Sequence, residues 1–113
     1  MGTSVSVRKD GRLTVRIEQD GDSLVVRALG ELDIATANSL DEELRRVWHC
    51  DASPILLDLG EVDFLDSVGV RSLLAVAKYS RESGDRLRIR IASAPIRRVI
   101  DVVGVERSLP LVE

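Results

Sequence analysis

The spacing of apolar residues changes several times along the chain, and this change limits the possible folds more than any other feature. Leu13, Val15 and Ile17 alternate with polar residues, and a period of two predicts a half-buried β-strand. Over residues 37–48 and 70–77, apolar residues instead recur at steps of three and four, which is typical of one face of an α-helix. A chain that alternates between the two periods predicts an α/β fold with crossover connections.

Turn signals and further apolar runs give the order of the remaining elements. Asp20-Gly21 is a hairpin signal, so residues 23–30 are expected to form a second strand antiparallel to the first. The run 55–59 is apolar on both faces, which predicts a central strand covered on both sides. Three later segments complete the chain: a fourth strand over residues 87–91, a third helix over residues 96–103 and an optional short strand within residues 107–113.

These elements predict a single α/β domain of order β-β-α-β-α-β-α. A length of 113 residues is that of one domain. The sheet is expected to be mixed, with four to five strands. The helices should lie mostly on one face, because the alternation in the first and fourth strands leaves part of the other face exposed. Residues 1–11 are mostly polar and predict a flexible leader, so that residues 12–113 form the domain.

Preferred capping residues predict where the helices begin and end. Asp33 and Thr36 are both candidate N-caps of the first helix. Ser53-Pro54 is expected to mark its end. Ser67 stands where the second helix should begin, and serine is a favoured N-cap.

Composition excludes several classes of function. The net charge is −3, with one residue each of Trp, Tyr and Phe, so the chain lacks the basic surface and the aromatic platform of a nucleic-acid binder. With one cysteine and one histidine, it offers no internal disulfide, cysteine cluster or multi-histidine metal site, and we expect no metal and no cofactor. The longest apolar runs have about five residues, whereas a membrane span needs ~18. With no signal peptide evident, the expected location is cytoplasmic.

The segment Phe64-Leu65-Asp66-Ser67-Val68-Gly69-Val70 carries the most chemical information. It lies between the central strand and the second helix, and functional groups of α/β sheets gather at the carboxyl ends of strands. A helix N-terminus can hold an anion such as a phosphate, and Gly69 lets a partner approach the backbone closely. Ser67 therefore has two interpretations, a helix cap or a phosphorylation switch.

Three motifs together resemble the STAS-domain anti-sigma factor antagonists of bacteria: Gly30-Glu31-Leu32-Asp33, Thr36-Ala37 and Asp66-Ser67-Val68-Gly69. The resemblance extends over residues 12–113. It implies that Ser67 is the serine phosphorylated by a partner kinase, and that Asp33 is an acidic residue close to it. The expected partner-binding residues lie in these motifs and in the first turn of the second helix: Glu31, Asp33, Thr36, Asp66, Val68, Gly69, Val70 and Arg71.

The resemblance also implies a mechanism of partner switching. The unphosphorylated protein would bind an anti-sigma factor that is itself a serine kinase of the histidine-kinase-like ATPase superfamily, and a sigma factor would be freed. Phosphorylation of Ser67 would release the antagonist, and a metal-dependent serine phosphatase would reset it. No contact with nucleic acid or a membrane is implied, and the protein is expected to be a monomer or a weak dimer. Many relatives carry a second serine where this chain has Val68.

Three other functions compete with this hypothesis. A STAS scaffold or accessory subunit of a signalling or lipid-transport complex would need no phosphorylation cycle. A phospho-aspartate receiver domain would need a lysine after its last strand, whereas Lys9 and Lys78 are the only lysines. A nucleotide-hydrolysing enzyme would need a phosphate-binding glycine motif, and neither Gly-x-x-x-x-Gly-Lys nor Gly-x-Gly-x-x-Gly occurs. The sequence therefore favours a protein that is not an enzyme.

Overall fold

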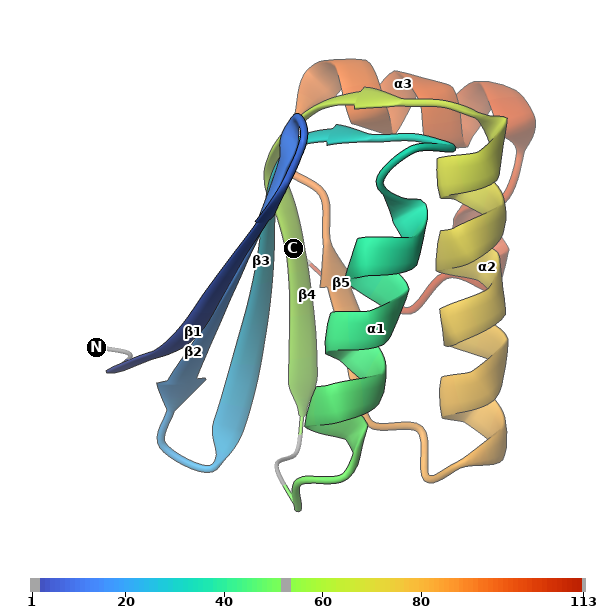
Figure 1. Cartoon of the computed structure of the whole chain (residues 1–113). Helices are drawn as coiled ribbons and strands as arrows, with labels where there is room; N and C mark the ends of the chain where they lie inside the picture. The colour runs from blue at the N-terminus through green and yellow to red at the C-terminus, as the bar shows by residue number, and fades with distance from the viewer. Residues whose placement is uncertain (1–2, 52–53, 113) are drawn as a thin grey trace.

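The computed structural model describes residues 3–51 and 54–112 as a mixed α/β structure. The alternation between the two hydrophobic periods is reproduced along the chain (Figure 1). The elements are β1 (Thr3–Asp10), β2 (Leu13–Asp20), β3 (Ser23–Leu32), α1 (Ala37–Trp48), β4 (Ile55–Leu65), α2 (Ser67–Glu82), β5 (Leu87–Arg90), α3 (Ala94–Val103), the short 3₁₀ helix η1 (Glu106–Ser108) and β6 (Leu111–Val112).

The strands form one sheet in the order β1-β2-β3-β4-β5-β6. The pairs β1–β2 and β2–β3 are antiparallel, and β3–β4, β4–β5 and β5–β6 are parallel. The predicted mixed sheet is thereby confirmed. Figure 1 shows α1 and α2 side by side on one face, with α3 across one end, while the opposite face has no helix over it. Helices mostly on one face were likewise predicted.

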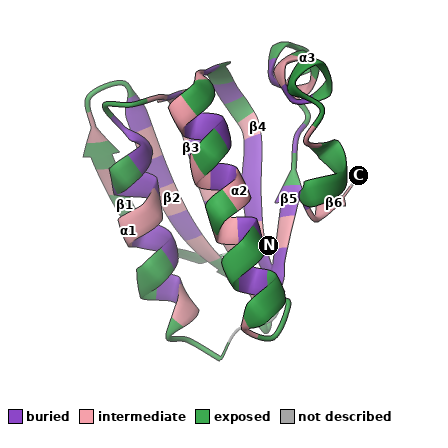
Figure 2. Cartoon of the chain, turned by 90° about the vertical axis from the view of Figure 1, so that its right-hand side faces the viewer, coloured by how far each residue is buried: buried purple, intermediate pink, exposed green. Residues whose placement is uncertain are grey.

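Two neighbouring rows of side chains explain why the helices gather on one face. Because side chains alternate along each strand, every second row across the sheet points to the same face. One row, toward the helices, is buried and apolar: Ile17, Val26, Leu57 and Ile89. The next row, on the bare face, is charged: Arg16, Arg27, Asp58 and Arg90. Figure 2 shows buried residues along the strands behind α1 and α2. The sides of these two helices that face away from the sheet carry many exposed residues.

The prediction of a flexible leader over residues 1–11 is wrong for its described part, because Thr3–Asp10 form β1, while residues 1 and 2 lie outside the described residues. This strand pairs with β2 through a turn at Gly11, which has a φ of +59°. The Arg8 guanidinium reaches α1 and pairs with Glu42 at 3.1 Å and Glu43 at 3.4 Å. The extra strand raises the count to six, above the predicted four to five. The optional last strand is present as β6.

β4 is also longer than the predicted run 55–59. The Asp58 carboxylate is 5% exposed, and it accepts hydrogen bonds from Arg27 Nη1 at 2.6 Å and from the Gly60 N–H at 2.8 Å. A hydrogen bond with Glu18 raises the pKa of Arg27, and the charge of Asp58 raises it further. The register between β3 and β4 shifts beside this carboxylate. Beyond it, β4 continues to Leu65, so β3 and β4 end side by side.

The first helix ends earlier than predicted. α1 stops at Trp48, six residues before Pro54, and Ser53 lies outside the described residues. Arg86 lies with its guanidinium carbon 5.4 Å from the centroid of the Trp48 ring and donates a hydrogen bond to the Trp48 carbonyl. This cation satisfies a carbonyl that the helix end leaves without an intrahelical donor. In the described ranges, no helix combines the length and apolarity needed to cross a membrane.

Candidate partner-binding site

The motifs that are far apart in the sequence meet at the carboxyl ends of β3 and β4. Glu31 pairs with Phe64 and Leu32 with Leu65, so the loop after β3 lies beside the start of α2. Asp66 joins the two segments. Its Oδ2 accepts the Ile34 N–H at 3.1 Å, and its Oδ1 accepts the Gly69 N–H at 2.8 Å. One carboxylate therefore holds the loop and the helix N-terminus in a fixed relation.

Asp66, rather than Ser67, is the N-cap of α2. Its extended backbone and its bond to the Gly69 N–H are those of a capping residue. Ser67 is the first residue of the helix and is exposed. Its hydroxyl makes no hydrogen bond within residues 3–51 and 54–112. The prediction that Ser67 caps the helix is wrong, and its hydroxyl is available for other chemistry.

Asp33 and Thr36 hold the loop before α1. The Asp33 carboxylate accepts the Ala35 N–H at 2.9 Å and the Thr36 N–H at 3.2 Å. The Thr36 hydroxyl donates to the Glu31 carbonyl at 2.8 Å and accepts the Asp33 N–H at 3.0 Å. Thr36 occupies the N-cap position of α1, although its side chain makes no capping bond. Of the two predicted caps, Thr36 has the position, and Asp33 closes the turn ahead of it.

The glycines of the motifs are required by close internal contacts. A Cβ on Gly69 would lie 2.5 Å from Leu65 Cδ1 and 2.6 Å from the Leu32 carbonyl oxygen. A Cβ on Gly30, which has a φ of +106°, would lie 2.0 Å from the Arg12 carbonyl oxygen. Gly69 is buried, so its missing side chain makes room for β3 and β4. The expectation that it admits a partner to the backbone is contradicted.

Burial divides the predicted partner-binding residues into two groups. Thr36 is 3% exposed and Val70 is 5% exposed, and Gly69 is also buried. Because these three residues are buried, they are not available for direct contact with a partner in this conformation, and they support the site from within. Of the others, Arg71 is exposed. Four are half-buried: Glu31, Asp33, Asp66 and Val68. Glu31 is partly occupied by an ion pair with Arg12 at 3.1 Å.

Two exposed apolar residues at this end of the sheet were not among the predicted partner-binding residues. Ile34 is 76% exposed and Phe64 is 46% exposed, although both are large and apolar. Ile34 follows Asp33 in the loop tied to Asp66, and Phe64 lies three residues before Ser67. The sequence marks these two residues only as large apolar residues that belong to neither the strand repeat nor the helix repeat and that lie in or beside polar segments. We call Ile34, Phe64, Ser67, Val68 and Arg71 the Ser67 surface.

The groups around the Ser67 surface bear on the chemistry that it can support. No group of three or more His, Cys, Asp or Glu side chains in the described ranges is arranged to hold a metal ion. Both Asp66 oxygens are engaged by backbone amides, so this carboxylate is poorly placed to act as a base toward a substrate. What the surface offers is apolar area for contact and one free hydroxyl.

Comparison with known proteins yields both relatives and a family. A curated relative from Paenibacillus polymyxa, named anti-sigma F factor antagonist, is 28% identical over 103 residues, which cover 88% of this chain and 86% of that protein. The anti-sigma-F factor antagonist RsfB of Mycobacterium tuberculosis is 28% identical over 101 residues, covering 88% of this chain and 80% of RsfB.

Solved structures agree with these matches. The crystal structure of an anti-sigma factor antagonist from Mycobacterium paratuberculosis superposes with a TM-score of 0.72 at 29% identity, covering 88% of this chain and 84% of that one. Unphosphorylated SpoIIAA, at 19% identity and a TM-score of 0.68 over 88% of both chains, shares the fold. The family model described as "Mlab, STAS domain" matches residues 15–113. With most of its length inside that match, this chain belongs to the STAS domain family.

Proposed function

We propose that this chain is an anti-sigma factor antagonist that acts by partner switching, with Ser67 as its phosphorylation site. One observation carries the choice of residue. Ser67 is exposed, and its hydroxyl is unbonded within the described structure because Asp66 takes the capping role. The motifs that resemble those of the family and the names of the relatives from P. polymyxa and M. tuberculosis support the type of function.

In this proposal the unphosphorylated chain binds an anti-sigma factor through the Ser67 surface. The partner is a serine kinase of the histidine-kinase-like ATPase superfamily, and its engagement frees a sigma factor in the cytoplasm. Exposed Ile34 and Phe64 support a protein contact, since large apolar and aromatic side chains are enriched in the central parts of interfaces. The chain is then a regulatory binding protein and not an enzyme.

The kinase bound at this surface would transfer the γ-phosphoryl group of ATP to Ser67. The Ser67 Oγ forms a bond to phosphorus, the bond to the bridging oxygen of ADP breaks, and the hydroxyl proton passes to a base of the kinase. The product carries about −1.5 to −2 additional charge. A metal-dependent phosphatase would hydrolyse the ester with water and restore the hydroxyl.

The added charge is sufficient to reverse binding. It lies next to the fixed Asp66 carboxylate and within a surface that also presents apolar Ile34. Desolvating such a group, or placing it against an acidic partner, costs several kcal/mol. A tenfold change in affinity requires only about 1.4 kcal/mol. One phosphate can therefore switch the complex without unfolding the antagonist.

The experiment is phosphopeptide mass spectrometry on the protein from its own cells, during growth and under stress. We expect a phosphate on Ser67 with an occupancy that differs between conditions. A Ser67→Ala variant should bind the anti-sigma factor in both conditions, while Ser108→Ala, at another exposed serine, should behave as the wild type. An unmodified Ser67 in every condition, together with a bound partner, would refute the switch and favour a STAS scaffold or accessory subunit.

A further inference from the structure

Two contacts between helices α1 and α2 stand at the ends of a groove between them. At one end the Ser72 hydroxyl donates to Asp41 Oδ1 at 2.6 Å. At the other end the rings of Trp48 and Tyr79 meet edge to face, with centroids 5.3 Å apart and planes at 67°. The two contacts are separated by seven residues on each helix, which is about 10.5 Å along the axis.

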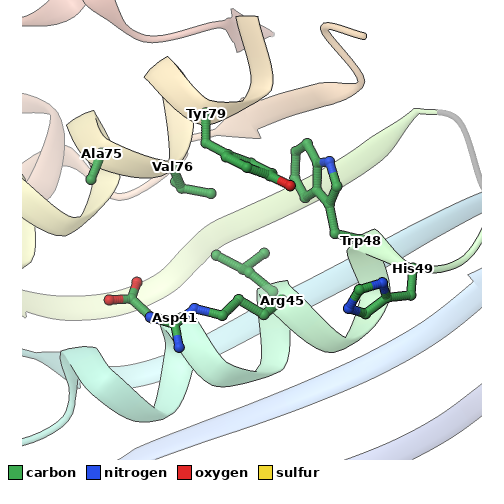
Figure 3. A pocket seen from close by; sticks show the side chains of 8 residues that line it. Asp41, Arg45, Trp48, His49, Ala75, Val76 and Tyr79 are labelled. Atoms are coloured by element: carbon green, nitrogen blue, oxygen red, sulfur yellow. The ribbon is translucent and has the colours of Figure 1, made fainter. Parts of the chain in front are cut away.

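An open cavity lies between the two helices in the stretch between these contacts. In Figure 3, Ala75 and Val76 lie on the α2 side of this space and Arg45 lies on the α1 side, and Leu44 of α1 also lines it. The cavity has a volume of about 510 Å³, within the ~300–1,000 Å³ of ordinary small-molecule sites. Its lining combines apolar, aromatic and charged side chains: Asp41, Leu44, Arg45, Trp48, His49, Ala75, Val76 and Tyr79.

The aromatic end of this α1–α2 groove is held in place by the rest of the fold. Arg86 stacks on the Trp48 ring and donates to the Trp48 carbonyl, which fixes both the side chain and the last turn of α1. Tyr79 is 53% exposed, and in Figure 3 its hydroxyl end points toward Trp48. A wall that is ordered before binding costs little entropy when a ligand arrives.

Arg45 gives the groove a cation for recognition. Its side chain is exposed and makes no ion pair or hydrogen bond within the described ranges. By contrast, neighbouring Arg46 pairs with Glu43 at 2.8 Å. Asp41, the acidic group of the groove, already accepts the Ser72 hydroxyl. The unpaired guanidinium is therefore the group to which an anionic ligand would bind.

We propose that the α1–α2 groove binds a small aromatic molecule that carries one anionic group. Its ring lies against Trp48 and Tyr79, and its carboxylate or sulfonate pairs with Arg45. None of the residues that line the groove belongs to the Ser67 surface. The proposal thus stands independently of the switch proposed above.

Two dyes that share a ring system test this proposal on the full chain. 8-Anilinonaphthalene-1-sulfonate has the sulfonate, and N-phenyl-1-naphthylamine lacks it. In fluorescence titrations we expect 1:1 saturable binding of both dyes, with the sulfonate tighter by about fivefold or more because of the charge-assisted bond. Arg45→Gln should remove this preference and leave the affinity for the neutral dye unchanged. Ala75→Leu should weaken both dyes more than tenfold by filling the groove.

Control variants separate the groove from other surfaces that bind dyes. Arg98→Gln removes an exposed arginine of α3, and it should keep both affinities and the preference for the sulfonate. Circular dichroism of each variant checks its fold, and Ala75→Leu places a good helix former at an exposed helical position. Absence of saturable binding, unchanged affinities in Ala75→Leu, or an intact preference in Arg45→Gln would each overturn the proposal.

Discussion

Replacing Asp66 by alanine tests the arrangement that connects the two motifs. The substitution removes acceptors for the Ile34 N–H at 3.1 Å and the Gly69 N–H at 2.8 Å. Loss of an N-cap costs about 1 kcal/mol, and loss of a second hydrogen bond to a charged group costs about 1.5–3 kcal/mol at full burial. Because Asp66 is only half-buried, we expect a total decrease of about 2–3 kcal/mol in the free energy of unfolding.

Urea denaturation followed by circular dichroism measures this loss of stability. The Asp66→Asn variant separates the contribution of the Gly69 cap from that of the hydrogen bond to Ile34. An asparagine oxygen can still cap Gly69, but its NH₂ group would face the Ile34 N–H, donor against donor. We therefore expect about half of the alanine effect, with faster amide exchange at Ile34 in both variants. Asp63→Ala, at a nearby exposed carboxylate, should change stability by less than about 0.5 kcal/mol. If Asp66→Ala were as stable as Asp63→Ala, the reasoning would be refuted.

Three further substitutions test other parts of the structure. Ile34→Ser, at a side chain 76% exposed, should leave the denaturation midpoint unchanged and weaken binding of the anti-sigma factor about tenfold in calorimetry; unchanged affinity would exclude Ile34 from the interface. Arg27→Met should lower the free energy of unfolding by about 2–3 kcal/mol. This loss is smaller than the ~3–5 kcal/mol expected when a buried charge is left without any partner, because Asp58 keeps its hydrogen bond from the Gly60 N–H. A loss below about 1 kcal/mol in urea titration would contradict this reasoning. Gly30→Ala should not yield folded protein, since its Cβ would meet a carbonyl oxygen at 2.0 Å; a cooperative native-like transition would show that the backbone can move.

The helices and β2 were predictable because each has its own hydrophobic period, and β4 because it begins with a continuous apolar run. β1 was not, since its apolar residues Val5 and Val7 are exposed at 58% and 51% and mark no core-facing side. The strand is held by backbone pairing with β2 and by the ion pairs of Arg8 with α1. Neither contact depends on an apolar face, so the hydrophobic pattern does not reveal the strand.

The candidate site was predictable as a group of residues but not as a set of roles. Asp66 and Ser67 are both preferred N-cap residues, so composition alone does not decide which of them caps α2. The loop after β3 decides which residue is the cap, because Asp66 makes hydrogen bonds to it. The Asp66 N–H donates to the Leu32 carbonyl, and the Asp66 carboxylate accepts the Ile34 N–H. Likewise, Gly69 looks open to a partner until the contact with Leu65 is known.

The fixed Asp66 also determines how a phosphate at Ser67 would act. The Gly69 N–H already donates to Asp66, so the phosphoryl group would have to displace a carboxylate to use it. Arg71, four residues further along α2 and exposed, stands on the same side of the helix, at the spacing that favours ion pairs. The phosphate would then remain on the surface, close to Arg71 and solvent. Phosphorylation at this position would change the charge of the Ser67 surface while the contacts that build the site stay in place.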